Sequence, residues 1–204
     1  MNNQTNESNE HPRRILGIDP GLGSTGAAII QQNGTKWRLI DSKVVTTAST
    51  TNITQRLFKI HQMVLAVIQQ YHPDCVAVEG IFYAKNVKST VQMAHGRGVA
   101  LLAAAESNIP VHEISPLEIK QSVVGKGRAS KEQVAQMVIL QLGLPTAPKT
   151  DHESDAMACA LAWAYREKHV LKVMQQITED TNVTNKTLLS MRRTSKGRSR
   201  GWKT

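Results

Sequence analysis

Two acidic residues stand at the ends of the two most apolar short segments of the chain. Asp19 follows the segment RILGI, and Glu79 follows DCVAV. Both segments are typical of buried strands, and ligands bind at the carboxyl edge of an open sheet with helical crossovers. Two carboxylates at one edge repel each other unless a cation lies between them or they share a proton. The pair therefore predicts a cation site, and the alternative is that each acid only caps its own turn.

A third candidate acid lies in the later segment TDHESDAMACALAWAY. Asp155 and His152 are three residues apart, so they share one side of a helix that is rich in alanine. Thr150 and Glu153 have the spacing of a capping box, and Asp151 also suits the first turn of a helix. A small rotation of the helix start would nevertheless bring Asp151 inward, so Asp151 and Glu153 stay candidate accessory ligands.

The candidate ligands favour a hard divalent cation. Carboxylates suit Mg²⁺, and an imidazole among them also suits Mn²⁺. Two such ions about 4 Å apart hold the attacking and leaving oxygens of a phosphoryl displacement. We therefore expect phosphodiester hydrolysis with two ions per subunit, held by Asp19, Glu79, His152 and Asp155.

Basic and aromatic residues surround these acids in the sequence. Lys120 and Lys131 belong to neighbouring predicted helices, and a lysine beside a scissile phosphate stabilises developing negative charge. The loop between them, VVGKGRAS, is basic, and an exposed ring after Glu79 can stack on bases. A solvated loop and a ring folded into the core are the alternatives. The predicted DNA contacts are Phe82, Tyr83, Lys85, Lys126 and Arg128.

The elements that must position these residues follow from periodicity and turn signals. Three strands come first, and Asn33-Gly34 predicts a hairpin between the second and the third. This order predicts an α/β fold with a mixed sheet, antiparallel in its first three strands and then parallel, with helices on both faces. The predicted helices cover residues 53–70 and 85–108, follow the caps Ser115 and Ser130, and end with 151–168.

Composition and charge predict one domain with a flexible N-terminal arm and a basic C-terminal tail. The 204 residues carry a net charge of +9, and residues 186–204 hold seven Lys/Arg and no acid. This balance favours a nucleic-acid partner. We expect a flexible arm at 1–12, one domain at 13–168 and a basic tail at 169–204. Because no apolar run is long enough for a membrane span and the first residues do not resemble a secretory signal, a cytoplasmic location without a membrane partner is expected.

Five motifs occur in a characteristic order within residues 13–168: GIDPGLGSTG, VAVEGIFYAKN, QMAHGRGVALLAA, IKQSVVGKGRASKEQV and DHESDAMACALAWA. Together they resemble the RuvC family of Holliday junction resolvases. The resemblance implies a ribonuclease H-like fold, a homodimer and a metal-dependent endonuclease of recombination and repair. Such an enzyme makes paired symmetric nicks in strands of like polarity at a four-way DNA junction. The RuvA and RuvB branch-migration proteins are the implied partners.

The resemblance also implies roles for single residues. The metal-ligand positions of the family fall on Asp19, Glu79, Asp155 and His152, the last at a position that holds Asp or His in this family. Its basic active-site residues and its aromatic residue near the junction centre match Lys120, Lys131 and Phe82. The segment QMAHGRGVALLAAA matches the long helix at the dimer interface, which would explain its glycines by the close approach of another backbone.

Other functions remain as alternatives. The nearest is a ribonuclease H-like nuclease that acts on other branched or RNA–DNA hybrid substrates. A non-catalytic junction-binding protein would be expected if the acid set were broken, but the set is complete. DPGLGSTG also resembles the first phosphate loop of the actin and sugar-kinase superfold. Those proteins need two such domains, for which this chain is too short.

Overall fold

The fold is built on a five-stranded sheet, within residues 12–80 and 87–195 that the computed structural model describes. Its strands lie in the order β3-β2-β1-β4-β5. The antiparallel part, β1, β2 and β3, is followed by β4 and β5, which run parallel to β1. The predicted mixed sheet is therefore confirmed, with strands β1 (Arg14–Asp19), β2 (Ser24–Asn33), β3 (Lys36–Thr46), β4 (Cys75–Glu79) and β5 (Val111–Ile114).

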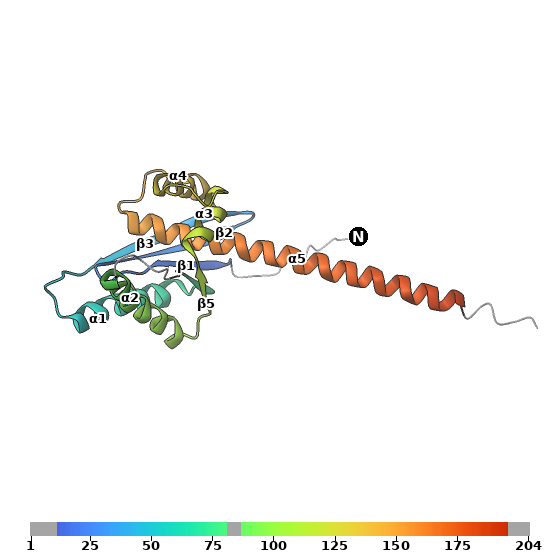
Figure 1. Ribbon diagram of the computed structural model, residues 1–204, viewed down its shortest axis with the longest axis horizontal. Helices are drawn as coiled ribbons and strands as arrows, with labels where there is room; N and C mark the ends of the chain where they lie inside the picture. Colours follow the sequence, from blue (N-terminus) through green and yellow to red (C-terminus); the bar gives the residue numbers. More distant parts are fainter. Residues whose placement is uncertain (1–11, 81–86, 196–204) are drawn as a thin grey trace, which may run out of the picture. The chain divides into compact units, whose positions relative to one another are not determined.

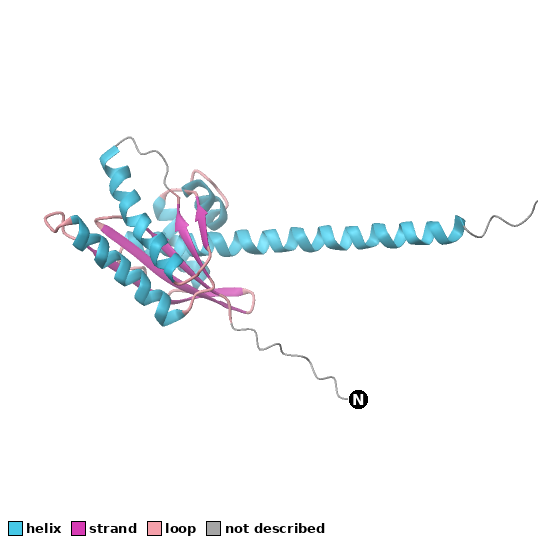
Figure 2. Ribbon diagram, turned by 90° about the horizontal axis from the view of Figure 1, so that it is seen from below, coloured by secondary structure: helices cyan, strands magenta, loops and turns pink. Residues whose placement is uncertain are grey.

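Helices cover both faces of the sheet, as predicted (Figure 1). Helices α1 (Ile53–Tyr71) and α2 (Val87–Glu106) pack on one face. The other face is covered by α3 (Pro116–Val124), α4 (Lys131–Leu142) and the beginning of α5 (Asp151–Ser195). Figure 2 shows the strands side by side between these two helical layers.

Alternation along the strands separates an aliphatic face from a face of small and acidic residues. Leu16 and Ile18 point to the side of α1 and α2, where they join a core cluster with residues of both helices. Gly17 and Asp19 point to the opposite side because successive side chains of a strand alternate. This second face is the one on which α5 lies, since a side chain at Gly17 would meet Ala156 and Ala160.

The hairpin between β2 and β3 forms one position later than Asn33-Gly34 predicted. Asn33 pairs with Lys36, so Gly34 and Thr35 are the two loop residues. Gly34 has φ 61°, a left-handed conformation that glycine adopts without steric cost. The sequence therefore predicted the hairpin turn correctly, and Gly34 occupies the first of its two loop positions.

Both predicted capping boxes are present at the helices that carry the lysines. The Ser115 side chain accepts from the Glu118 backbone N–H, and the Glu118 side chain accepts from the Ser115 N–H. Ser130 and Gln133 make the same reciprocal pair at the start of α4. These caps fix where α3 and α4 begin, and hence where Lys120 and Lys131 stand on them.

Helix α5 is much longer than predicted. It continues to Ser195, whereas an end near residue 168 was expected. No glycine or proline occurs between Thr150 and Lys196, so nothing in the chain breaks the helix. The chain divides into two compact units, Met1–Ala164 and Tyr165–Thr204, and α5 belongs to both. Within the described residues, none of the helices combines the length and apolarity needed to cross a membrane.

Candidate active site

Asp19 and Glu79 end two neighbouring parallel strands. Ile18 of β1 stands opposite Val78 of β4, so the two acids that follow leave the sheet side by side. Asp19 is 9% exposed, and Glu79 is half-buried. The expected meeting of the two carboxylates at one sheet edge is therefore confirmed.

Glycines in the sheet let α5 approach unusually close. A Cβ at Gly17 would lie 2.0 Å from the Ala156 carbonyl oxygen, and one at Gly26 would lie 2.0 Å from the His152 carbonyl oxygen. Real Cβ atoms do not come so near a backbone oxygen, so only glycine fits at either position. The first turns of α5 thereby rest directly on β1 and β2, and this contact carries His152 and Asp155 to the edge where Asp19 lies.

Two short contacts join the acids to basic groups. His152 Nδ1 donates to Asp19 Oδ2 at 2.6 Å, and Lys131 Nζ donates to Asp155 Oδ2 at 3.2 Å. Because an ionised carboxylate only accepts, Nδ1 is the protonated ring nitrogen. In the neutral ring this leaves the Nε2 lone pair for another ligand. Asp19 thus fixes the orientation of the imidazole.

The raised pKa values of Asp19 and Glu79 show that ionising both carboxyl groups at once costs free energy. Burial and the nearby Asp155 raise the pKa of Asp19, against the opposing effect of the His152 hydrogen bond. Burial, followed by the charges of Asp19 and Asp155, raises the pKa of Glu79 to about 7. The Asp155 charge in turn raises the pKa of Lys131. A cation between these carboxylates would remove the repulsion that the shifts reflect.

The donor set fits a hard divalent cation in its chemistry, although its side chains are not arranged around one. Among the described residues, no three His, Cys, Asp or Glu side chains form a ready metal cluster. The reason is visible in the contacts, since Asp19 bonds to His152 and Asp155 bonds to Lys131. Three carboxylates and an imidazole converge on one edge, and oxygen donors of this kind suit Mg²⁺ or Mn²⁺.

A cavity of about 670 Å³ opens in front of the acids. It brings together the four predicted ligands with both predicted lysines, Lys120 of α3 and Lys131 of α4. Gly21 and Gly23 of the loop after Asp19 form part of its wall. The cavity also includes Gln92 and Met93 of α2, which begin the motif QMAHGRGVALLAA. The resemblance had matched this motif to a dimer interface, so neither residue was predicted at the site.

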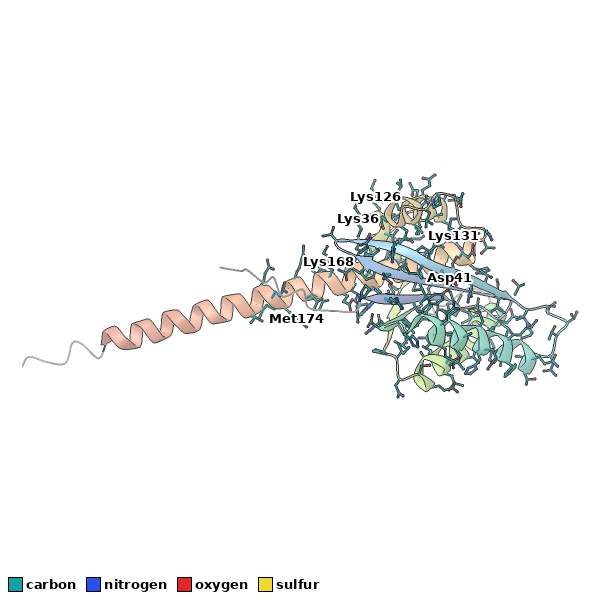
Figure 3. The ribbon with its side chains drawn as sticks, turned by 180° about the vertical axis from the view of Figure 1, so that it is seen from behind. Lys36, Asp41, Lys126, Lys131, Lys168 and Met174 are labelled. Carbon is teal, nitrogen blue, oxygen red and sulfur yellow. The ribbon has the colours of Figure 1, made fainter. Side chains whose placement is uncertain are left out.

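The remaining predicted site residues lie elsewhere. Lys126 and Arg128 are exposed on the loop between α3 and α4 and do not line the cavity; Figure 3 labels Lys126 and Lys131 on this side of the molecule. Phe82, Tyr83 and Lys85 fall outside the described residues, so their predicted DNA contacts stay predictions.

Glu153 serves as the predicted cap. Its Oε2 accepts from the backbone N–H groups of Lys149 and Thr150, at 2.7 and 3.3 Å. Its Oε1 accepts from the Ser42 hydroxyl at 3.4 Å, and the Thr150 hydroxyl accepts from the Glu153 N–H. Asp151 is exposed and does not line the cavity, although its charge is among those that raise the pKa of Lys131.

A contact within the same chain explains why residue 96, in the HGRG segment, is a glycine. A Cβ there would lie 2.9 Å from the Gly21 carbonyl carbon and 3.1 Å from the Leu22 N. The close backbone is therefore the cavity loop of the same chain, not the second copy that the resemblance suggested. Gly98, two residues later, has open space in front of it.

Comparisons with known proteins identify the family of the chain. The family described as "Crossover junction endodeoxyribonuclease RuvC" matches residues 15–163. The proteins of that name from Ruminiclostridium cellulolyticum and Chloroflexus aurantiacus are 43% and 44% identical to this chain. These alignments span 72% and 74% of the chain, and 89% and 93% of the two relatives.

Solved structures extend the similarity to the fold. A structure described as "T. thermophilus RuvC in complex with Holliday junction substrate" is 35% identical and superposes with a TM-score of 0.74. It covers 77% of this chain and 96% of its own. The yeast mitochondrial Holliday junction resolvase Ydc2 is 16% identical with a TM-score of 0.56, which supports the fold alone.

Proposed function

The chain belongs to the RuvC family of crossover junction endodeoxyribonucleases and is a Holliday junction resolvase, and we propose that the acid cavity in front of β1 and β4 is its active site. The observation that carries this proposal is the convergence of Asp19 and Glu79 from the sheet with His152 and Asp155 from α5. The burial and the raised pKa values of Asp19 and Glu79 are those of groups that a bound cation would stabilise in the ionised form.

The nuclease is metal-dependent, as its family is, and we propose two Mg²⁺ ions per subunit, with Mn²⁺ as the alternative. Asp19, Glu79, Asp155 and the Nε2 atom of His152 would hold them. A divalent ion supplies a Lewis acid and a nucleophilic water for phosphodiester hydrolysis. His152 supports Mn²⁺ as a substitute because imidazole is a better ligand for Mn²⁺ than for Mg²⁺.

The chain's own residues then position and neutralise the scissile strand. Lys120 and Lys131 line the cavity, where an ammonium group stabilises charge that develops on a phosphate. Lys131 already pairs with Asp155, so a phosphate that enters the cavity competes for this lysine. The proposed contacts to the rest of the junction are the predicted aromatic and basic residues Phe82, Tyr83, Lys85, Lys126 and Arg128.

We propose a homodimer that makes paired nicks, one per subunit, in strands of like polarity. The support is a line of exposed positions on α2: Val87 is 76% exposed, Val91 48% and Leu102 51%. Their spacing places them on one side of the helix, and the open space at Gly98 lies on the same side. A second copy that packs there would cover this surface.

Two finer proposals rest on the resemblance. RuvA and RuvB are the proposed branch-migration partners. A cytoplasmic location is proposed because the substrate is DNA.

The deciding experiment compares a synthetic four-way junction with a linear duplex of the same sequence, each in Mg²⁺ and in Mn²⁺. We expect two symmetric nicks in the junction and none in the duplex. Equal cleavage of the duplex, or of a forked or RNA–DNA hybrid substrate, would favour the nuclease with broader substrates. Binding without cleavage in either metal would favour a non-catalytic junction-binding protein.

A monomeric mass at micromolar concentration, together with full paired nicking, would contradict the homodimer.

A further inference from the structure

The part of α5 after the nuclease unit carries a line of exposed apolar side chains. Val170 is 42% exposed, Val173 39%, Met174 60% and Ile177 59%. Their separations of three or four residues place them along one side of the helix. We call these four residues the α5 stripe. Apolar groups in such a row are characteristic of a surface that another helix covers.

The sequence continues this spacing through the rest of the helix. Steps of seven residues lead from Ile177 through Thr184 to Met191, and from Met174 through Thr181 to Leu188. The backbone is helical throughout, to Ser195. Apolar positions that alternate at three and four residues form the seam of a coiled coil, and the two threonines make the middle of this seam weaker.

The established family activity does not account for this segment. The family match ends at residue 163, and the two relatives align over 89% and 93% of their own length while covering 72% and 74% of this chain. A function of Tyr165–Thr204 must therefore be read from its own residues.

Two lysines of this segment lie on another side of the helix. Lys168 and Lys172 are exposed and separated from the stripe. Arg166 and Glu167 fall on the stripe side, one turn before its first residue, so the apolar row begins after them. Lys168 and Met174 are about 120° apart around the helix, and Figure 3 labels both. Two such helices can therefore bring their apolar sides together without bringing their lysines together.

We propose that the α5 stripe pairs with the same stripe of a second copy of this chain, as a two-stranded coiled coil. The proposal rests on the proposed homodimer, which holds two of these helices in one assembly at a high effective concentration. Duplex DNA is a less suitable partner for the stripe, because proteins bind the DNA phosphates with lysine and arginine side chains and the stripe is uncharged. In the sequence, the heptad spacing continues from Val170 to Met191, long enough for several turns of such a pair.

The test uses single cysteines in the full-length chain. Cys75 and Cys159 are buried, so an introduced surface cysteine is the reactive one. Met174→Cys places a thiol in the stripe, and Lys168→Cys is the matched control on the lysine side. Under mild oxidation without DNA, we expect the Met174→Cys variant to form an intermolecular disulfide at least roughly tenfold faster than the Lys168→Cys variant, because the d and a positions of paired helices face each other. Non-reducing electrophoresis measures the rate.

Equal rates for the two variants, or no disulfide from either, would overturn the proposal. So would slower alkylation of the Met174→Cys thiol on addition of duplex DNA in the absence of a disulfide, since the stripe would then face DNA. In the Met174→Cys background, Ile177→Asp should reduce disulfide formation about tenfold, because a buried charge opposes the apolar seam. Its failure to do so would also count against the pairing.

Junction cleavage, measured on the same preparations, separates this proposal from the proposed function. Paired nicking by a Met174→Cys variant that forms no disulfide would overturn the coiled coil and leave the nuclease intact. The disulfide without any cleavage would support the coiled coil and contradict the active site.

Discussion

Helix α5 contains two regions that meet their surroundings in opposite ways. In the first, Ala156 and Ala160 are fully buried against the glycines of the sheet. In the second, Leu171 and Met174 are large and remain 56% and 60% exposed. Small side chains allow two backbones to approach, and this approach brings His152 and Asp155 to Asp19. Large exposed side chains instead provide area for association.

The difference shows that two parts of one helix can have different roles. Small residues let the first part pack closely and position the site, and large exposed residues suit the second part to association. The family match ends at residue 163, close to the boundary between the two regions. The packed region thus lies within the family match, and the exposed region lies beyond it. Four predictions test how the packed region positions the site and stabilises the fold. They are given from the largest expected effect to the smallest.

The largest loss of cleavage is expected at Asp19, the acid that bonds to His152 of the packed region. Asp19→Asn keeps the shape of the side chain and removes the charge, so junction cleavage should fall by roughly 10³-fold or more, while junction binding persists through basic residues. Nicking assays and gel-shift titration measure the two. Asp41→Asn is the matched control, since Asp41 lies on β3 and bonds to Tyr71 (Figure 3). Metal-dependent nicking by Asp19→Asn at the normal rate would contradict the metal-site proposal.

Close packing itself can be broken at Gly17. A methyl group there would collide with the Ala156 carbonyl oxygen, so Gly17→Ala should destabilise the protein by roughly 3 kcal/mol. Cleavage should fall as well, because α5 has to move away from the sheet. Gly23→Ala is the control, since a Cβ at Gly23 meets nothing within 4 Å. Urea unfolding of both variants tests this; equal stability would mean that the contact of α5 with the sheet is loose.

The stability of the fold should depend on pH through Glu79, which lies beside the packed region. In metal-free protein the pKa of Glu79 is raised from 4.5 to about 7. The folded state then holds this proton more firmly than the unfolded chain. Stability is therefore lost as the pH rises from about 4.5 to 7, by up to roughly 3 kcal/mol from this residue. Glu79→Gln should remove that part of the slope in urea unfolding with a chelator present. The same slope in both proteins would show that Glu79 ionises normally.

The smallest effect is expected at the cap of the packed region. Glu153→Ala removes the acceptor for the N–H groups of Lys149 and Thr150, which should cost about 1 kcal/mol of stability. Junction cleavage by the folded variant should stay within about twofold of normal, because one Glu153 oxygen accepts from the cap N–H groups and the other from the Ser42 hydroxyl. A loss of cleavage as large as that of Asp19→Asn would instead make Glu153 a metal ligand.

Local signals in the sequence predicted much of the fold and the site. Ser115 and Ser130 marked helix starts because a capping box is made by residues three apart. Apolar segments that end in an acid marked β1 and β4, and the helical spacing of His152 and Asp155 gave them a common side. The end of α5 was missed because the alanine-rich pattern stops near residue 168, whereas the chain has no glycine or proline between Thr150 and Lys196 to interrupt the helix.

The sequence by itself determined which acids could reach one sheet edge, since strand ends and helix faces follow from short-range spacing. Only the tertiary structure decided how they meet. The pairing of Asp19 with His152, of Asp155 with Lys131, and of Gly96 with the Gly21 backbone joins residues 133, 24 and 75 positions apart. Such contacts depend on how closely α2 and α5 approach the sheet, and no local pattern specifies that distance. For the same reason, the pKa of Glu79 follows from burial and neighbouring charges that exist only in the folded chain.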